Sequence, residues 1–239
     1  MIKQNLINKL QYPHFTLNYQ RYLPHDKASR ILDFGCGHGS AIAYLKEAGY
    51  TNVVGADTNP VSAAWAKANV SNDIWHIDDP ESFLRAHTDQ FDFILVKDVI
   101  FYFPREKLIP WTRLLRSALK SGGKMMVEIT NGASFAGPLV RYKDYRIQHI
   151  LTEHSLAEIL IDSGFSIQVI YGCKLPLITF KRRLFALVML AWRNILRLIY
   201  IAERGLDETN PKILSPRLIA VARASKPDME NTRYQNDNF

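Results

Sequence analysis

The sequence is poor in cysteine: Cys36 and Cys173 are its only two, and no cysteine–histidine group has the spacing of a zinc site. This excludes a disulfide framework, and we expect no metal. Residues 1–15 lack the apolar run that a secretory signal needs, so we expect a reduced, cytoplasmic setting. No internal repeat or low-complexity tract interrupts the 239 residues.

Positive charge, by contrast, is abundant and unevenly spread. The chain carries a net charge of +7, and between residues 174 and 204 the only acidic residue is Glu203. The basic residues of that segment are Lys174, Lys181, Arg182, Arg183, Arg193, Arg197 and Arg204. A localised excess of this kind indicates an anionic partner or surface.

Apolar runs of strand length alternate with helical patterns along most of the chain. The predicted strands are 30–35, 52–57, 73–77, 91–96, 124–130, 165–172 and 217–225. The predicted helices are 40–49, 59–70, 80–87, 105–120 and 152–164, and residues 121–123 are expected to form a turn. Such alternation predicts an α/β, Rossmann-like, doubly wound sheet of seven mostly parallel strands with helices on both faces.

Two long connections interrupt the alternation and define the expected organisation. We predict an N-terminal helical segment 1–28, one domain 29–225 with insertions 131–151 and 173–216, and a flexible polar tail 226–239. Connections as long as these two insertions are usually functional.

The first predicted strand runs into a loop with glycine at alternate positions, Gly35, Gly37 and Gly39. No lysine closes the loop, which excludes a phosphate loop of the Walker type. The third glycine comes one position early for a dinucleotide loop, and the carboxylate of Asp33 would repel a pyrophosphate. It suits a ligand that carries an ammonium group. A glycine turn between strand and helix, without a ligand, remains an alternative.

Asp33 and these glycines, followed by Asp57 at the end of the next strand, resemble motif I and the ribose-binding acid of class I S-adenosylmethionine-dependent methyltransferases. The resemblance implies S-adenosylmethionine as cofactor and a last strand that runs antiparallel. Asp78, rather than Asp79, matches the residue that reaches the adenine amine. The implied cofactor-binding residues are Asp33, Gly35, Cys36, Gly37, Gly39, Asp57, Thr58, Asp78 and Lys97.

Residues 131–165 show a narrower resemblance, to methyltransferases of bacterial surface-polysaccharide and O-antigen clusters. Arg141, Tyr142, Asp144, Thr152, Ser155 and Leu156 carry it. Arg146, Ile147 and Gln148 replace the Thr-His-Glu run of that group, and Phe101 and Tyr102 replace its Glu-His pair. The resemblance implies O-methylation of a sugar or glycan intermediate.

The acceptor side is predicted from fewer signals. A hydroxyl acceptor needs a base, and His149 is the preferred candidate because imidazole titrates near neutrality. Asp98 and Lys97 follow the fourth strand and would face the donor or the acceptor, although Lys97 also suits a lysine extending from a strand end. We place Tyr102, Arg141, Tyr142 and Asp144 at the acceptor and interpret His154 as a surface residue.

Other functions remain open at this point. A small natural-product or quinone-like acceptor is the main alternative, followed by RNA and by a non-catalytic subunit that keeps the fold. We expect no nucleic-acid partner, because the charge is local and few aromatic residues accompany it. The oligomeric state is not determined by these patterns.

Residues 180–205 predict one amphipathic helix with its arginines along a narrow stripe and an apolar stripe opposite. Arg193, Asn194 and Arg197 interrupt the apolar run, so we do not expect a spanning helix. Three roles suit residues 181–204: peripheral contact with the anionic inner face of a membrane, a cap that presents arginines to a phosphorylated acceptor, or packing of the apolar stripe on the sheet edge.

Overall fold

The computed structural model describes residues 9–176 and 180–224. The predicted tail 226–239, the first eight residues of the N-terminal segment and residues 177–179 of the second insertion lie outside the described residues.

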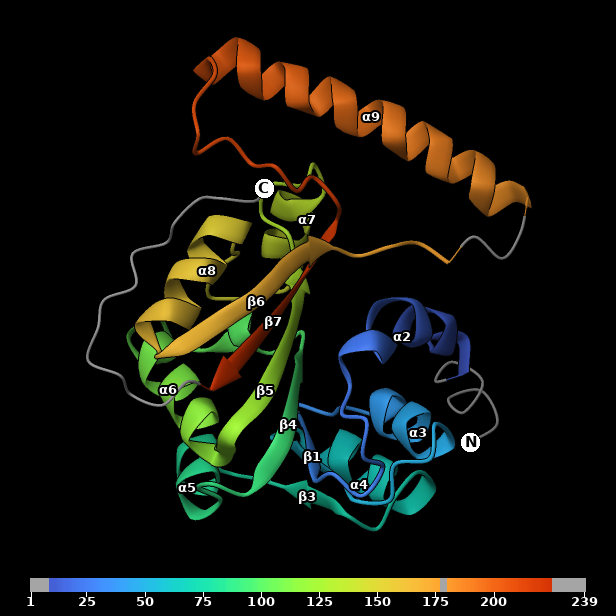
Figure 1. The fold of residues 1–239 in the computed structure, drawn as a ribbon, viewed down its shortest axis with the longest axis vertical. Coiled ribbons are helices and arrows are strands. Elements are labelled where there is room, and N and C mark those ends of the chain that lie inside the picture. Colours follow the sequence, from blue (N-terminus) through green and yellow to red (C-terminus); the bar gives the residue numbers. More distant parts are fainter. Residues whose placement is uncertain (1–8, 177–179, 225–239) are drawn as a thin grey trace.

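The fold is a seven-stranded sheet with the strand order β3-β2-β1-β4-β5-β7-β6 (Figure 1). Its strands are β1 Ile31–Phe34, β2 Val53–Asp57, β3 Ile74–His76, β4 Phe91–Lys97, β5 Leu119–Thr130, β6 Phe165–Gly172 and β7 Arg217–Ala224. Only β7 is antiparallel to its neighbours, so the predicted Rossmann-like topology is confirmed. The order reverses between β1 and β4, and the crevice at such a switch point is where α/β sheets bind ligands.

Helices cover both faces of the sheet. One face carries α2 Tyr12–Asn18, α3 Ser40–Glu47 and α4 Pro60–Asn69, and the other carries α5 Pro80–Ala86, α6 Leu108–Ala118 and α8 Glu153–Asp162 (Figure 1). Successive residues of β4 alternate between the two cores: Phe93 and Leu95 pack toward α3, whereas Ile94 and Val96 pack toward α6. Burial on both sides explains why the central strands read as unbroken apolar runs.

The start of β5 corrects the sequence prediction. Residues 121–123 were expected to be a turn between helix and strand, but α6 ends at Ala118 and β5 begins at Leu119. The strand bulges here, since Phe91 pairs with Leu119 and Phe93 already pairs with Lys124. Gly122 supplies the left-handed conformation, φ +77°, that the bulge requires.

The N-terminal segment packs against the domain. Phe15 of α2 and Tyr19, just before the 3₁₀ turn η1 Gln20–Tyr22, are fully buried beside Tyr44 of α3. This packing brings α2 over the carboxyl ends of the central strands.

The two insertions follow the carboxyl ends of β5 and β6, which lie at the same end of the sheet. The first contains α7 Gly137–Lys143 and closes through a bridge between Asn131 and Leu151. The second contains α9 Phe180–Arg204, which joins the end of β6 to the start of β7. Short 3₁₀ turns, η2 Ile100–Tyr102 and η3 Arg105–Lys107, follow β4.

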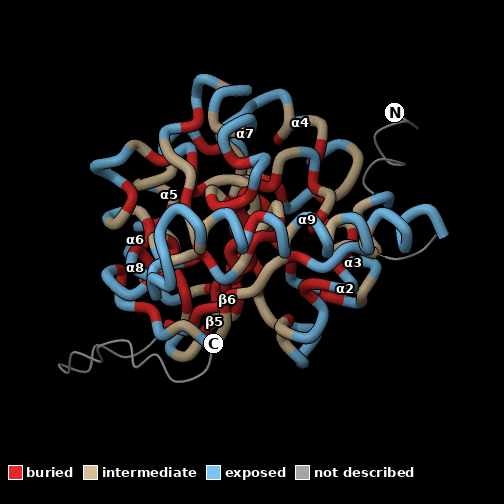
Figure 2. The backbone as a smooth tube through the Cα atoms, turned by 90° about the horizontal axis from the view of Figure 1, so that it is seen from above, coloured by how far each residue is buried: buried red, intermediate tan, exposed pale blue. Residues whose placement is uncertain are grey.

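Of the three roles left open for residues 181–204, packing of the apolar stripe on the sheet edge does not agree with the structure. Seen from above, the helix crosses the molecule with most of its length exposed (Figure 2). Leu196 is its one buried residue among those described. It packs with Ala133 and Leu214, so α9 is attached mainly through the first insertion and the segment that returns to β7.

Candidate active site

The glycine loop after β1 is built around the carboxylate of Asp57. The backbone N–H of Gly37 donates to Asp57 Oδ2 at 2.7 Å, and that of Asn59 donates to Oδ1 at 2.8 Å. The Asp57 side chain is therefore fixed at the end of β2 beside the loop. Carboxylate oxygens held in this way can accept hydrogen bonds from a ribose diol.

Gly35 shows why the loop needs glycine. Its φ is +79°, and a Cβ added there would lie 2.1 Å from Cγ2 of Val99. The loop thus passes close under the segment after β4, at the switch point of the sheet. A Cβ added to Gly37, whose φ is +52°, would have no neighbouring atom within 4 Å, so the backbone there is open to a ligand.

Asp33 lies on β1 directly beneath the loop and is buried. Burial raises the pKa of its carboxyl to about 7; the positive charge of Lys97 opposes this rise and the negative charge of Asp57 adds to it. A nearby positive charge stabilises the ionised form of a buried carboxyl, so Asp33 suits the ammonium group of an amino-acid moiety.

The end of β3 separates the two candidate adenine contacts. Asp79 caps α5: its carboxylate accepts the backbone N–H groups of Glu81 and Ser82 at 3.0 and 3.1 Å. The neighbouring Asp78 side chain is 95% exposed, with His76 at 3.7 Å. Asp78 therefore keeps a carboxylate available for a ligand, whereas Asp79 serves the helix.

The remaining predicted cofactor residues divide by exposure. Cys36 is buried, and its sulfur packs where a side chain on Gly55 would be, so it helps to hold β2 against the loop. Thr58 is exposed next to Asp57. Lys97, at the end of β4, pairs with Asp98 at 3.0 Å.

These groups fit S-adenosylmethionine. The open glycine loop allows close approach of a ligand, the oriented carboxylate of Asp57 suits the ribose hydroxyls, and the buried Asp33 suits the ammonium group. These residues lie at or just after the carboxyl ends of β1, β2 and β3, at the same end of the sheet. Which of these residues touch the cofactor stays a prediction.

Sequence reasoning missed a polar cluster at the carboxyl ends of β4 and β5 and the amino end of the antiparallel β7. Glu128 is fully buried there, accepts a hydrogen bond from His14 Nε2 at 2.9 Å, and is also contacted by Tyr19 and Arg217. Burial would raise the pKa of Glu128, but the hydrogen bond from His14 and the positive charge of Arg217 outweigh it and lower the pKa to about 2. Arg217 continues to Asp98 Oδ1 at 2.7 Å.

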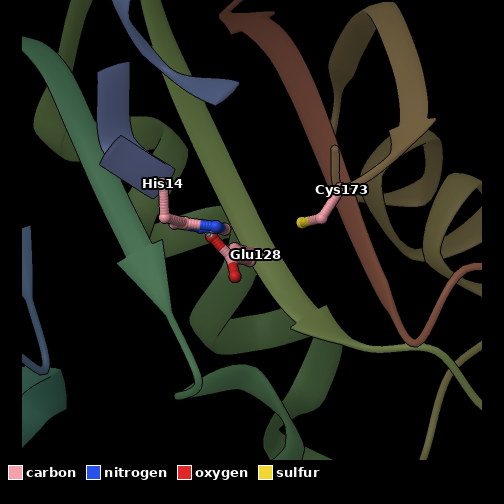
Figure 3. Close-up of side chains that lie close together, drawn as sticks. All are labelled: His14, Glu128 and Cys173. Carbon is pink, nitrogen blue, oxygen red and sulfur yellow. Dashed lines mark hydrogen bonds and ion pairs between the residues drawn. The ribbon is translucent and has the colours of Figure 1, made fainter. Parts of the chain in front are cut away.

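One part of this cluster resembles a metal site. His14, Glu128 and Cys173 bring donor atoms within 4.8 Å of one another, from α2, β5 and the residue after β6 (Figure 3). A cation would meet a Glu128 charge already balanced by Arg217. It would also meet a thiol, because burial raises the pKa of Cys173 far above its ordinary value and thiolates, not thiols, bind metals. We therefore assign these residues to the hydrogen-bonded cluster.

Asp98 belongs to the same cluster. It is the residue after β4, has a φ of +59°, and lies between Arg217 and Lys97. Both carboxylate oxygens are thus engaged by cations. Its catalytic role stays a prediction, and the geometry suits the positioning of Arg217 and Lys97.

The acceptor-side residues are partly brought together. Tyr102 donates to Asp144 Oδ2 at 3.1 Å, which joins η2 to the segment after α7. Arg146 grips the same carboxylate through Nε and Nη2 at 3.0 and 2.7 Å. The guanidinium of Arg141 lies over the ring of Tyr142, which is 82% exposed. The sequence did not reveal that Arg146 is the partner of Asp144.

His149 lies beside η2. Its Nε2 donates to the carbonyl of Ile100 at 3.1 Å, so the described contacts leave Nδ1 as the nitrogen with a free lone pair. Burial lowers the pKa of the imidazole, which the hydrogen bond to Ile100 partly offsets. A neutral imidazole with one basic nitrogen can accept a proton. Its assignment as base stays a prediction.

Fold and site together define a Rossmann-like enzyme that uses S-adenosylmethionine. A protein-family model described as a methyltransferase domain matches residues 10–169, and the chain belongs to this family. It is an S-adenosylmethionine-dependent methyltransferase. The comparison with curated proteins gives no match.

Solved structures agree on the fold. An S-adenosylmethionine-dependent methyltransferase from Archaeoglobus fulgidus aligns with a TM-score of 0.64 at 18% identity, covering 90% of this chain and 94% of that one. A putative methyltransferase of Haloferax volcanii, solved with the Trm112 activator, aligns with a TM-score of 0.68 at 14% identity, covering 92% and 94%. A Burkholderia thailandensis 1,6-didemethyltoxoflavin N1-methyltransferase, solved with S-adenosylhomocysteine, gives 0.56 at 16% identity, covering 90% and 77%.

Proposed function

We propose that this methyltransferase acts on a hydroxyl group of a sugar or glycan intermediate. The observation that carries the proposal is the first insertion, which packs His149 and the Asp144–Arg146 pair against η2, where Tyr102 donates to Asp144. Planar polar side chains with fixed hydrogen-bonding edges suit a polyhydroxylated acceptor. Arg146 supplies a salt bridge to Asp144 where the surface-polysaccharide group has its Thr-His-Glu run.

The residues of the chain then divide the work. Asp57 and Asp33 would hold the ribose and the ammonium group, with Asp78 at the adenine. When bound, S-adenosylmethionine supplies an electrophilic methyl group, whose bond to sulfur breaks as the bond to the acceptor oxygen forms. His149 would take the hydroxyl proton on Nδ1, and the rest of the rate comes from alignment.

Incorporation of labelled methyl groups tests the acceptor class. Cells that express the chain or its Asp57→Ala variant are supplied with labelled methionine, and their glycan, lipid, small-metabolite and RNA fractions are counted. We expect label that depends on Asp57 in the glycan fraction, in a form stable to mild base as a methyl ether is. Label in RNA alone would overturn the proposal.

A small apolar acceptor, such as a natural product or a quinone, is the second candidate. The exposed apolar residues of α9 near the same edge favour it, for example Leu187 at 64% exposure. The labelling experiment separates the two, because such a product extracts into organic solvent and contains no sugar. We also propose that the protein works in the cytoplasm, where S-adenosylmethionine is made.

A further inference from the structure

Helix α9 presents an apolar surface to solvent. At 100° per residue, Leu184, Leu187, Ile195 and Leu198 share an arc of about 80°. These four side chains are 56%, 64%, 48% and 66% exposed. The helix is attached to the domain by the opposite side, where Leu196 is buried and Tyr200 donates to the carbonyl of Ala133 at 3.2 Å. The outward face is therefore apolar along most of its length.

We infer that this outward face of α9 lies flat in the surface of an anionic lipid bilayer. Lys181 and Arg183 flank the apolar arc, and the segment 174–204 accounts for most of the net positive charge of the chain, although Arg182, Arg193, Arg197 and Arg204 lie on the opposite side of the helix. A self-paired dimer would bring Lys181 and Arg183 of the two copies toward each other, whereas anionic headgroups complement these cations. Trp192, 37% exposed and about 60° around the helix from the arc, suits the interface between lipid and water.

Length and composition alone would also allow a crossing. Among the described residues α9 is the one helix that could span a membrane, with a mean hydropathy of 1.7 over its most apolar 18-residue window. The arginines therefore do not exclude a crossing by themselves, contrary to the expectation from the sequence.

The topology of the sheet excludes it. The helix connects β6 to β7, and these strands are hydrogen-bonded neighbours, with Gly172 opposite Leu218. A helix that crossed the bilayer would oblige residues 205–216 to cross back without helical structure. Hydrocarbon does not tolerate such backbone, because its N–H and C=O groups would have no partners.

The returning segment is instead tied to the domain. The backbone N–H groups of Lys212 and Ile213 donate to Glu153 at 2.6 and 3.0 Å, and Asn131 donates to the carbonyl of Ile213 at 2.7 Å. Both ends of α9 thus stay on one side of the bilayer. Strand β6 ends and β7 begins at the end of the sheet that carries the candidate site. Docking of α9 therefore turns this end of the sheet toward the membrane.

Flotation of the full chain with vesicles tests the inference and needs no methyl transfer, so its result is independent of the acceptor. Vesicles of phosphatidylcholine with phosphatidylglycerol should carry the protein, and added salt should weaken binding. Leu187→Asp together with Leu198→Asp should reduce binding at least about tenfold. The control Val61→Asp alters an equally apolar side chain, 75% exposed on α4, and should leave binding unchanged.

Four results would overturn the inference. The first is equal binding to vesicles of phosphatidylcholine alone, and the second is loss of binding in Val61→Asp. The third is bound protein that alkaline carbonate does not release from the vesicles. The fourth is a dimer that the α9 substitutions disrupt, without any binding to vesicles. Thermal melts of each variant show that it is folded; the substituted side chains are exposed, so we expect unchanged melting temperatures.

Discussion

Arg217, the first residue of β7, lies 2.7 Å from Asp98 at the end of β4, and its guanidinium also contacts the buried Glu128 of β5. One side chain therefore ties together the ends of β4, β5 and β7. Through His14, which donates to Glu128 at 2.9 Å, the same network holds α2 over the site edge.

Arg217→Met should be strongly destabilising, because it leaves the buried Glu128 charge without the guanidinium that contacts it. We expect the free energy of unfolding to fall by about 3–5 kcal/mol in urea titrations. The double variant with Glu128→Gln should recover part of the loss. Arg223→Met, at an exposed arginine of the same strand, is the control and should stay within about 0.5 kcal/mol of wild type. Equal losses in the two arginine variants would contradict this role for the cluster.

This network also marks what the sequence could not predict. The Glu128 contacts join residues 114 and 89 positions apart, and no local pattern encodes such pairs. The glycine loop and Asp57 were predictable because a loop and the end of the next strand have fixed places in a parallel sheet.

The strand at residues 121–123 and the exposed apolar face of α9 were not predicted, for different reasons. Residues 121–123 resemble a turn, and only the pairing with β4 reveals a bulge. The amphipathic pattern of α9 was predictable, but a pattern does not specify what covers the apolar face. That depends on neighbours distant in the sequence, which here leave it exposed.

Asp57→Asn should weaken cofactor binding without unfolding the protein. The substitution removes the negative charge of the Asp57 carboxylate. The N–H groups of Gly37 and Asn59 orient this carboxylate, which would accept hydrogen bonds from the ribose. Loss of charged hydrogen bonds of about 1.5–3 kcal/mol each predicts affinity for S-adenosylhomocysteine lower by tenfold or more, measured by calorimetry. Asp73→Asn, at an exposed carboxylate just before β3 and away from the candidate site, should bind normally. Unchanged affinity in Asp57→Asn would count against the cofactor site.

Asp78→Asn and Asp79→Asn should separate adenine binding from helix capping. Asp78 is free to meet the base, so its variant should bind S-adenosylhomocysteine more weakly and keep its melting temperature. Asp79 caps α5, so its variant should lose about 0.5–2 kcal/mol of stability and keep its affinity. The reverse result would reassign the adenine contact to Asp79.

Asp33→Asn should stabilise the ligand-free protein in a pH-dependent way. Burial raises the folded-state pKa of Asp33 from 3.8 to about 7, so between these values the folded state binds more protons than the unfolded state. Stability of the wild type therefore falls as pH rises through this window and stays reduced above it. The variant should melt at a higher temperature than wild type near pH 8, with little difference near pH 4. A gain that is the same at both pH values would contradict the titration of Asp33.

His149→Ala should reduce kcat/KM on a hydroxyl acceptor by about 10²- to 10⁴-fold, as expected for loss of a general base. Burial lowers the pKa of His149 below its ordinary value of 6.5, so wild-type activity should persist into mildly acidic solution before the imidazole becomes protonated. The variant should lose this acidic limb of the pH–rate profile and bind S-adenosylhomocysteine as wild type does. His154→Ala is the matched control, at a histidine whose side chain is 45% exposed, and should leave rate and profile unchanged. An unaltered profile in His149→Ala would remove the base assignment and make His14, hydrogen-bonded to Glu128, the next residue to substitute.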